Sequence, residues 1–392
     1  MSTLDMSTEQ SALRGRWAVA ALFLVNGFLM GSWAPQIPFM LPRHNITEFT
    51  LGLLILLIGL GAVTAMAWTG WLINHYGSKT VTTVFGVIAC VSFALMVLAP
   101  TIPLAIPVLI SFGATLGSMD VAMNANAVEI ERRLNKAVMS SSHGFWSLGG
   151  FIGGGIGGGL IARLGVESHA VFAAGAGLAV IFAARPFLVT EAHHHEDHVE
   201  KPKYTWPKGG AIYVLGFMAL FSMIPEGAVL DWAAIYLGKE MGADVSTAGL
   251  AFAFFCGTMA IMRFLGDAMR DRLGAVQTMR ISGFIAAAGM LVGGIAPNAW
   301  FAIAAFAVAG IGIANMVPIA FSAAGNQPGL SPGAGISLVT MMGYSGILVA
   351  PASIGFVAEH IGFRITYVTL AFFLVVVALL AGRVASADRA KV

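Results

Sequence analysis

Twelve apolar segments, each about 20 residues or longer, account for most of this 392-residue chain. An α-helix rises about 1.5 Å per residue, so about 20 apolar residues cross the hydrocarbon core of a bilayer. Only 10% of the residues are charged and 58% are hydrophobic, against roughly 25% charged in soluble domains. We therefore expect an all-α integral membrane protein. The expected segments are 16–41, 50–73, 80–99, 103–129, 137–162, 168–189, 210–237, 246–269, 276–296, 299–323, 333–358 and 363–383.

A short polar turn ending in glycine occurs twice, each time between two apolar segments. The first is Gly70–Lys79 (GWLINHYGSK) and the second is Asp267–Gly274 (DAMRDRLG). Gly77 and Gly274 lie 197 positions apart, which is about half of the chain. This spacing indicates an internal duplication into two halves of parallel topology, an arrangement typical of membrane transporters.

One long hydrophilic stretch separates the first six segments from the last six. We expect an N-terminal six-helix bundle over residues 1–189, a cytoplasmic linker over 190–208 and a C-terminal six-helix bundle over 209–392. Four histidines in the linker could bind a metal, but no neighbouring residue fixes their geometry, so a solvated linker is the favoured interpretation. They are His193, His194, His195 and His198.

Several function classes are disfavoured by composition. The net charge of +2 is small and scattered, so no nucleic-acid partner is expected. The two cysteines, Cys90 and Cys256, lie in apolar segments and can form neither a disulfide scaffold nor a zinc site. The sequence has no phosphate-binding loop, nucleophile–base pair or metal set, so ATP-driven transport, enzyme activity and a cofactor are not expected. The first apolar segment is longer than a signal peptide and has no small-residue cleavage site, so it is expected to be retained.

Lys and Arg placement predicts the orientation in the membrane. If the N-terminus is cytoplasmic, sixteen of the 21 basic residues lie in cytoplasmic segments, Arg263 lies within a helix, and only four lie outside. Those four are Arg43, Arg163, Lys239 and Arg364. Cytoplasmic loops of membrane proteins carry the excess of positive charge. Both termini and the linker are therefore predicted to be cytoplasmic in a multi-pass protein of a bacterial-type inner membrane.

The repeated loop resembles that of the major facilitator superfamily, a resemblance that extends over nearly the full chain. That family has twelve helices in two pseudo-symmetric bundles, with the loop Gly-x-x-x-Asp-Arg/Lys-x-Gly-x-Arg/Lys after the second helix and a degenerate copy after the eighth. The first copy here has Asn74 in place of Asp and His75 in place of a base. The resemblance implies a cytoplasmic gate that biases the outward-facing state, in which Arg263 and Asp267, one helical turn apart, form a local ion pair. The implied gate residues are Gly70, Asn74, Gly77, Lys79, Arg263, Asp267, Asp271, Arg272 and Gly274.

Three further strings resemble a narrower branch, the fucose-permease-like transporters of the YbjJ type. They are Asp120–Glu129 (DVAMNANAVE), Ser142–Gly150 (SHGFWSLGG) and Glu226–Trp232 (EGAVLDW). The resemblance implies sugar import by proton symport. Eight glycines between Gly149 and Gly159, with no proline nearby, differ from the proline-containing signature of the drug-exporting members.

Ionisable side chains inside apolar segments are the candidates for proton coupling, because a charge in hydrocarbon is costly and faces the bundle interior. They are Glu226, Asp120, Asp231 and His143. Asp120 has no basic partner expected at its depth, and an apolar environment without a cation favours a neutral carboxyl. Each of three candidates has an alternative to proton coupling. Asp120 could be a buried acid bonded to Asn124, Asp231 could hold a helix end near the outer gate, and His143 could have a packing role.

Polar and aromatic side chains at mid-depth are the candidates for substrate binding. They are Asn26, Asn124, Trp146, Asn315 and Tyr344; Asn26 and Asn315 could instead join neighbouring helices. Trp33 and Trp232 are expected at the membrane interface, where aromatic residues cluster. Because no cation is expected at mid-depth, a neutral or cationic metabolite is favoured.

These observations predict a monomeric secondary active transporter that moves a small, neutral or cationic metabolite by alternating access. The resemblance makes the metabolite sugar-like, and protons are the expected coupling ion. An efflux antiporter for small organic compounds and a non-transporting sensor with a transporter fold are the alternatives.

Overall fold

The computed structural model describes residues 3–134, 138–190, 210–328 and 332–388. Every regular element within these residues is a helix, and twelve spans among them are long and apolar enough to cross a membrane. The predicted all-α membrane architecture is therefore confirmed. The linker lies outside the described residues except for Thr190, and with it lie its four histidines, so the predicted boundaries at 189 and 209 stay predictions.

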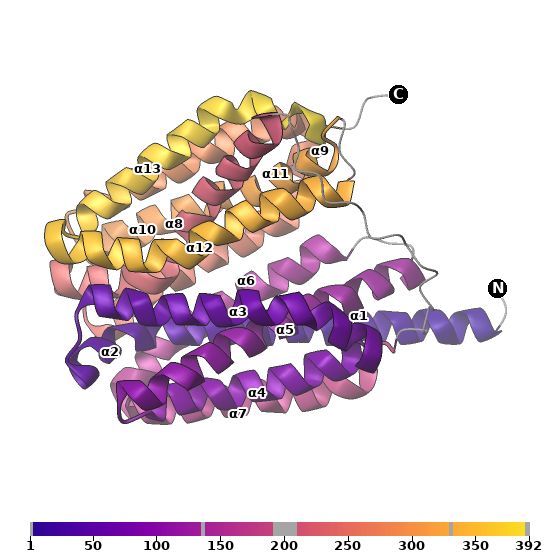
Figure 1. The fold of residues 1–392 in the computed structure, drawn as a ribbon, viewed down its shortest axis with the longest axis horizontal. Helices are drawn as coiled ribbons and strands as arrows, with labels where there is room; N and C mark the ends of the chain where they lie inside the picture. Colours follow the sequence, from indigo (N-terminus) through magenta and orange to yellow (C-terminus); the bar gives the residue numbers. More distant parts are fainter. Residues whose placement is uncertain (1–2, 135–137, 191–209, 329–331, 389–392) are drawn as a thin grey trace.

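Two bundles lie side by side (Figure 1). The N-terminal bundle consists of α1 (Thr3–Trp33), η1 (Ala34–Gln36), α2 (Ile37–His44), α3 (Glu48–Tyr76), α4 (Ser78–Leu98), α5 (Ile102–Leu134), α6 (Met139–Leu164), α7 (Val166–Ala184) and η2 (Arg185–Phe187). The C-terminal bundle consists of α8 (Gly210–Met241), α9 (Val245–Gly294), α10 (Ala299–Ile313), α11 (Met316–Gly325), α12 (Pro332–Ile361), α13 (Phe363–Leu379) and η3 (Leu380–Ala387). α9 holds two spans joined at a kink, and α10 with α11 forms one span.

The backbone repeats at the spacing seen in the two loops. Gly77 has φ 78° and Gly274, at the kink of α9, has φ 77°, a region that glycine adopts without a steric penalty. The other positive-φ residues in the described part of the chain form two more pairs, Asn45 with Gly242 and Gly165 with Gly362, each again 197 positions apart. The three turns between helices thus recur in both halves, which confirms the pseudo-symmetric bundles.

We call the side that carries the start of α1, the end of α7 and the start of α8 the terminal side, and the opposite side the far side (Figure 1). Arg43 pairs with Glu167 at 3.4 Å on the far side. Glu240 pairs with Arg364 at 3.5 Å. Each residue of the second pair lies 197 positions after its counterpart, so both halves keep the ion pair with the charges exchanged.

The two bundles are in close contact on the far side. α6 packs against α9, and α3 packs against α12. Gly158 of α6 lies against the backbone of Val245 and Ser246, and Gly52 of α3 lies against the backbone of Pro351. Glycine lets two helices approach closely because no side chain separates them. The glycine-rich stretch of α6 therefore forms part of the surface between the bundles.

Polar contacts also join the bundles on the far side. The Lys239 ammonium of α8 pairs with the Glu48 carboxylate of α3. The Phe49 backbone N–H, in the first turn of α3, donates a hydrogen bond to Glu359 of α12 at 3.1 Å. A carboxylate at a helix N-terminus also interacts favourably with the helix dipole. These contacts close the far side.

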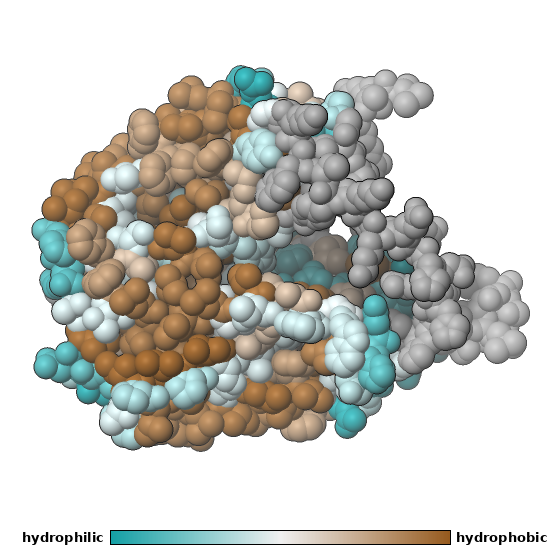
Figure 2. Space-filling view, viewed as in Figure 1, coloured by the Kyte–Doolittle hydropathy of each residue, from teal (hydrophilic) through white to brown (hydrophobic). Residues whose placement is uncertain are grey.

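The terminal side is open by comparison. Figure 2 shows a hollow between the two bundles on this side, and apolar surface along the outside of both bundles. Large apolar side chains such as Trp68 and Phe372 are exposed on that surface, as expected for residues that face lipid. Trp33 and Trp232 are instead fully buried within the protein, so neither ring faces lipid, and their depth at the membrane interface stays a prediction.

Candidate functional site

Charged and aromatic side chains from both bundles meet at mid-depth between them. Asp120 of α5 comes from the N-terminal bundle, and Glu226 of α8, Arg263 of α9 and Tyr344 of α12 come from the C-terminal bundle. Tyr344 lies within electrostatic reach of both Asp120 and Glu226. The side chains of Glu226 and Arg263 are 23% and 18% exposed although both lie in the interior of membrane-spanning helices. Partial exposure at this depth indicates that the side chains line the space between the bundles.

Arg263 joins this cluster and connects the two bundles. Its Nη1 donates a hydrogen bond to Ser147 Oγ of α6 at 2.6 Å, and its Nη2 lies 3.8 Å from Glu226 Oε1. The guanidinium carbon lies 5.8 Å from the centre of the Trp146 ring, within the range of a cation–π interaction. The expectation that no cation reaches mid-depth is therefore wrong.

The direction of the Arg263 side chain explains this correction. Arg263 lies two helical turns after Cys256 on α9, so the two share a face. Cys256 packs against Gly150 of α6, and the same face carries Arg263 toward Ser147. The sequence placed Arg263 near a helix end, as the ion-pair partner of Asp267 in the gate; the side chains of Asp267 and Asp271 lie outside what the structure describes.

Asn26 holds Trp146 at the edge of the cluster. Asn26 Oδ1 accepts a hydrogen bond from Trp146 Nε1 at 2.9 Å, and Asn26 Nδ2 donates to the Leu116 carbonyl at 3.2 Å. Both functional groups of the amide are thus used to join α1, α5 and α6. Of the two roles that the sequence left open for Asn26, these bonds support the interhelical one, with Trp146 oriented toward Arg263.

The other predicted residues of the N-terminal bundle have local partners. Asn124 Nδ2 donates to the Asp120 backbone carbonyl at 2.8 Å, so Asn124 stays on the turn that carries Asp120. The His143 ring meets Phe23 edge-on, with centres 5.1 Å apart, and lies within electrostatic reach of Arg263. Its described neighbours therefore connect His143 with Arg263.

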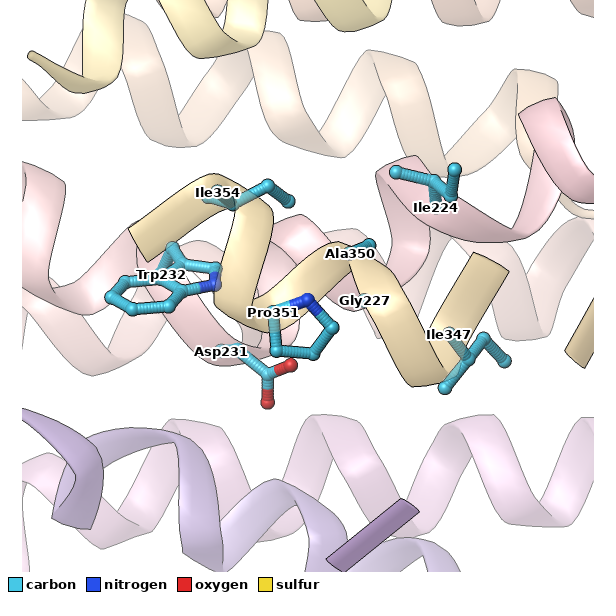
Figure 3. Close-up of a pocket in the computed structure, with 8 residues that line it drawn as sticks. All are labelled: Ile224, Gly227, Asp231, Trp232, Ile347, Ala350, Pro351 and Ile354. Atoms are coloured by element: carbon cyan, nitrogen blue, oxygen red, sulfur yellow. The ribbon is translucent and has the colours of Figure 1, made fainter. Parts of the chain in front are cut away.

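Two predicted residues lie apart from the cluster. Asp231 lines a small pocket on the far side together with Trp232 and Pro351 (Figure 3). Asn315 lies at the break between α10 and α11, beside Gly266 of α9, and its Nδ2 has no hydrogen-bond partner in the described structure.

The predicted gate residues lie at the terminal-side turns. Gly70, Asn74, Gly77 and Lys79 occupy the end of α3 and the start of α4, and Arg272 and Gly274 occupy the kink of α9. Asn74 and Arg272 are exposed. These loops lie on the terminal side (Figure 1), and a gating role for them stays a prediction.

Two residues missed by the sequence reasoning hold the second loop. Arg270 donates hydrogen bonds to Ser322 Oγ at 2.9 Å and to the Ala387 carbonyl. Asp388 Oδ1 accepts from the Ala275 backbone N–H at 2.6 Å, directly after Gly274. The loop thus fixes the end of η3 within its own half, through partners more than 100 positions away that no local pattern indicates.

The duplication gives an independent reason to single out the central charges. The positions 197 before Glu226 and Arg263 are Leu29 and Met66, and the position 197 after Asp120 is Val317. An apolar side chain thus occupies each equivalent place in the other half. The shared fold does not require charge at these positions, so their charges are candidates for function. Comparing the two halves of the sequence would have moved Arg263 from the gate residues to the candidates for the central site.

Comparisons with known proteins agree with this architecture. The family model of the Major Facilitator Superfamily matches residues 19–225 and 209–391. An uncharacterized MFS-type transporter of Yersinia pestis is 34% identical, over 96% of this chain and 98% of its own length. The solved structure of a D-xylose–proton symporter superposes with a TM-score of 0.74 at 15% identity, covering 94% of this chain and 97% of that one. A structure of the nucleoside transporter NupG (D323A mutant) gives 0.73 at 13% identity, covering 94% and 99%. The chain therefore belongs to the Major Facilitator Superfamily, and it is a membrane transporter and not an enzyme.

Proposed function

We propose that this chain is a secondary active transporter that moves a small polar metabolite by alternating access, coupled to protons. The observation that carries the proposal is the central cluster of Asp120, Glu226, Arg263 and Tyr344, which offers both hydrogen-bond donors and acceptors between the two bundles. Substrate sites of such transporters lie near mid-depth between the repeats.

The arrangement of the bundles corresponds to one of the two states that alternating access needs. The far side is closed by the Glu48–Lys239 pair and the glycine contacts, and the hollow is on the terminal side (Figure 2). If both termini are cytoplasmic, as the basic residues predict, this state is inward-facing in an inner membrane. Opening of the far side then requires these contacts to separate.

Glu226 and Asp120 are the proposed proton carriers of the central cluster. Glu226 is 3.8 Å from Arg263, too far for a hydrogen bond, so a substrate oxygen can compete for the guanidinium donors. A substrate that takes over these donors leaves the Glu226 carboxyl without its cation, which is the coupling step of this proposal. Asp120 forms no ion pair among the described residues, which favours proton binding there also.

The substrate class follows from the same groups. The expectation of a neutral or cationic solute rested on the absence of a central cation, and Arg263 removes that basis. We propose a hydroxyl-rich, sugar-like solute whose oxygens accept from Arg263 and whose hydroxyl groups donate to the carboxylates. Xylose and nucleosides, named for two proteins of the same fold, are examples of such solutes. The fucose-permease-like branch stays a prediction that supports the same class.

The first test is a thermal-shift screen of the purified protein against sugars, nucleosides, amino acids and organic acids at two pH values. A ligand that binds only the folded state raises the apparent stability. Each hit is then tested for counterflow and pH-gradient-driven accumulation in proteoliposomes. A pH-dependent hit among the hydroxyl-rich compounds, followed by counterflow, would support the proposal; absence of counterflow for every hit would contradict it. Everted vesicles then distinguish import from efflux.

Two substitutions test proton coupling. Glu226→Gln is expected to abolish gradient-driven accumulation while preserving exchange, because the amide binds substrate but no proton. Asp120→Asn is expected to flatten the pH dependence of binding. Glu129→Gln is the matched control, since Glu129 forms ion pairs with Arg132 and Arg133 away from the cluster. Unchanged accumulation in Glu226→Gln would exclude that residue from coupling.

A further inference from the structure

Asp231 lies in the closed far side without a partner for its charge. The residue is 7% exposed and lies on α8 in the part that faces α12. No hydrogen bond or ion pair connects its carboxyl group to another described residue. Figure 3 shows the carboxyl group directed away from α8, past Pro351 toward the N-terminal bundle. Asp231 thus lies at the seam that must open when the far side opens.

The pocket beside Asp231 contains a second unused polar group. Trp232 is fully buried, and its Nε1–H has no acceptor in the described structure. Figure 3 shows the indole nitrogen on the edge of the ring turned toward Asp231 and Pro351. The pocket is lined by apolar side chains such as Ile347 and Ile354 and has room for about one water molecule. An unused donor and an unused carboxyl therefore share a space that one water can fill.

Nearby charged groups are engaged elsewhere. Lys239 is eight residues from Asp231, about 12 Å along α8, and pairs with Glu48 of α3. In the other direction Glu226 is next to Arg263. Glu359 of α12 is bonded to the Phe49 N–H.

Two groups of α13 near this part of α8 are engaged as well. Arg364 of α13 pairs with Glu240. Tyr367 of α13 lies within electrostatic reach of Asp231, but its hydroxyl donates to the Ala228 carbonyl at 3.1 Å. An ionised carboxylate buried in this setting has no compensating charge, and its desolvation costs several kcal/mol. The neutral acid avoids that cost.

The duplication argues that Asp231 is not required by the fold. The position 197 before it is Ala34, which is 1% exposed in the equivalent far-side region of the N-terminal bundle. A small apolar residue therefore fits this place. A buried carboxyl retained where alanine suffices has a role other than packing.

We propose that Asp231 and its pocket form a proton-binding site separate from the central cluster, occupied when the far side is closed. As the bundles close, the carboxylate takes up one proton from the far-side solution, and one water molecule accepts from Trp232 Nε1–H and bonds to the new carboxylic acid. As the bundles part, water enters the pocket and the proton returns to the far side. This inference goes beyond the proposed function, which assigns coupling to Glu226 and Asp120, and it concerns the gate alone.

The test measures far-side opening without any substrate. Ala350→Cys places a thiol on the pocket wall in a background with Cys90→Ala and Cys256→Ala. The rate at which a membrane-impermeant maleimide labels this cysteine is measured in acidic and in mildly alkaline buffer. It is divided by the labelling rate of Glu167→Cys, an exposed far-side position. The ratio corrects for the pH dependence of an exposed thiol, and the Asp231 variants, which keep the same apolar pocket wall, correct for that of the pocket thiol. We expect the ratio to be severalfold higher in alkaline buffer, where the ionised carboxylate favours the open far side.

Asp231→Asn mimics the protonated acid, so its labelling ratio is expected to be low in both buffers. Asp244→Asn removes an exposed far-side acid whose hydrogen bonds to Ser246 and Thr247 lie within the first turn of α9, and asparagine keeps the N-cap. It is the matched control and is expected to keep the pH dependence of the parent. Asp231→Ala guards against a folding defect specific to the amide and is expected to behave like Asp231→Asn. The proposal would be overturned if the labelling ratio of both Asp231 variants depended on pH as strongly as the ratio of the parent does. Because no transported solute is involved, this result is independent of whether the proposed transport function holds.

Discussion

The glycine contact between α6 and α9 allows a test of far-side closure by a single methyl group. A Cβ atom at Gly158 would lie 2.6 Å from the Val245 carbonyl oxygen and 2.9 Å from Ser246 Cα, where ordinary contacts begin near 3.4 Å. Both neighbours are backbone atoms, so no side chain can rotate away. At Gly159, the next residue of the same helix, a Cβ atom would have no heavy atom within 4 Å.

Gly158→Ala therefore forces the two helices apart by several tenths of an ångström. Overpacking of this kind costs about 1–3 kcal/mol. The cost falls only on the state in which the bundles touch, so it shifts the equilibrium toward the open far side by about 5- to 150-fold. Gly159→Ala is the matched control because it carries the same methyl group and the same increase in helix propensity of about 1 kcal/mol.

The measurement is the distance between spin labels on two far-side loops. Pro100→Cys and Pro297→Cys are exposed, equivalent positions of the two halves, in a background without Cys90 and Cys256. Pulsed electron resonance of Gly158→Ala is expected to show a larger population at long distance than the parent or Gly159→Ala. Identical distance distributions for the two alanine variants would refute the role of this contact in closure.

Three further substitutions test individual contacts. Lys239→Ala leaves the Glu48 side chain, which is 10% exposed, without its cation. Because Lys239 is itself 58% exposed, we expect the closed far side to be destabilised by about 1 kcal/mol or less. The same spin labels should then show a modest increase in the population at long distance. Asn26→Ala removes the acceptor of Trp146 Nε1, and a several-fold weaker Kd for the identified substrate is expected; an unchanged Kd would contradict the positioning role. Asp244→Ala removes the N-cap of α9 and is expected to lower stability at neutral pH by about 1 kcal/mol. Hydrogen bonds from Ser246 and Thr247 hold the pKa of Asp244 well below its usual range, so this contribution is lost as the pH falls below the ordinary Asp pKa, and the Tm values of variant and parent should approach each other in acid.

The number and extent of the spans were predictable from the sequence because membrane insertion acts on each segment separately. A run of about 20 apolar residues satisfies the bilayer whatever its neighbours are. The duplication was also predictable, since Gly77 and Gly274 need the same positive φ. The direction of the Arg263 side chain was not predictable, because it depends on which helix packs against the face of α9 that carries Arg263. The cap of Asp388 on Ala275 likewise depends on chain segments 113 positions apart.

The site was predictable only in part, and the missing information lies in the differences between the two halves. Thr69 donates to Ser118 at 2.9 Å in the N-terminal bundle. The equivalent positions of the C-terminal bundle are Gly266 and Asn315, where the glycine offers no partner and Asn315 Nδ2 stays without one. A duplicated fold keeps in both copies the contacts that its packing needs, such as the ion pair with exchanged charges. A polar group present in one copy, and replaced by an apolar or absent side chain in the other, must be retained for another reason. Asn315 does not meet this criterion, because its counterpart Ser118 is also polar. Asp120, Glu226, Asp231 and Arg263 do meet it, and substitution of each by its counterpart in the other half should impair transport more than it impairs folding.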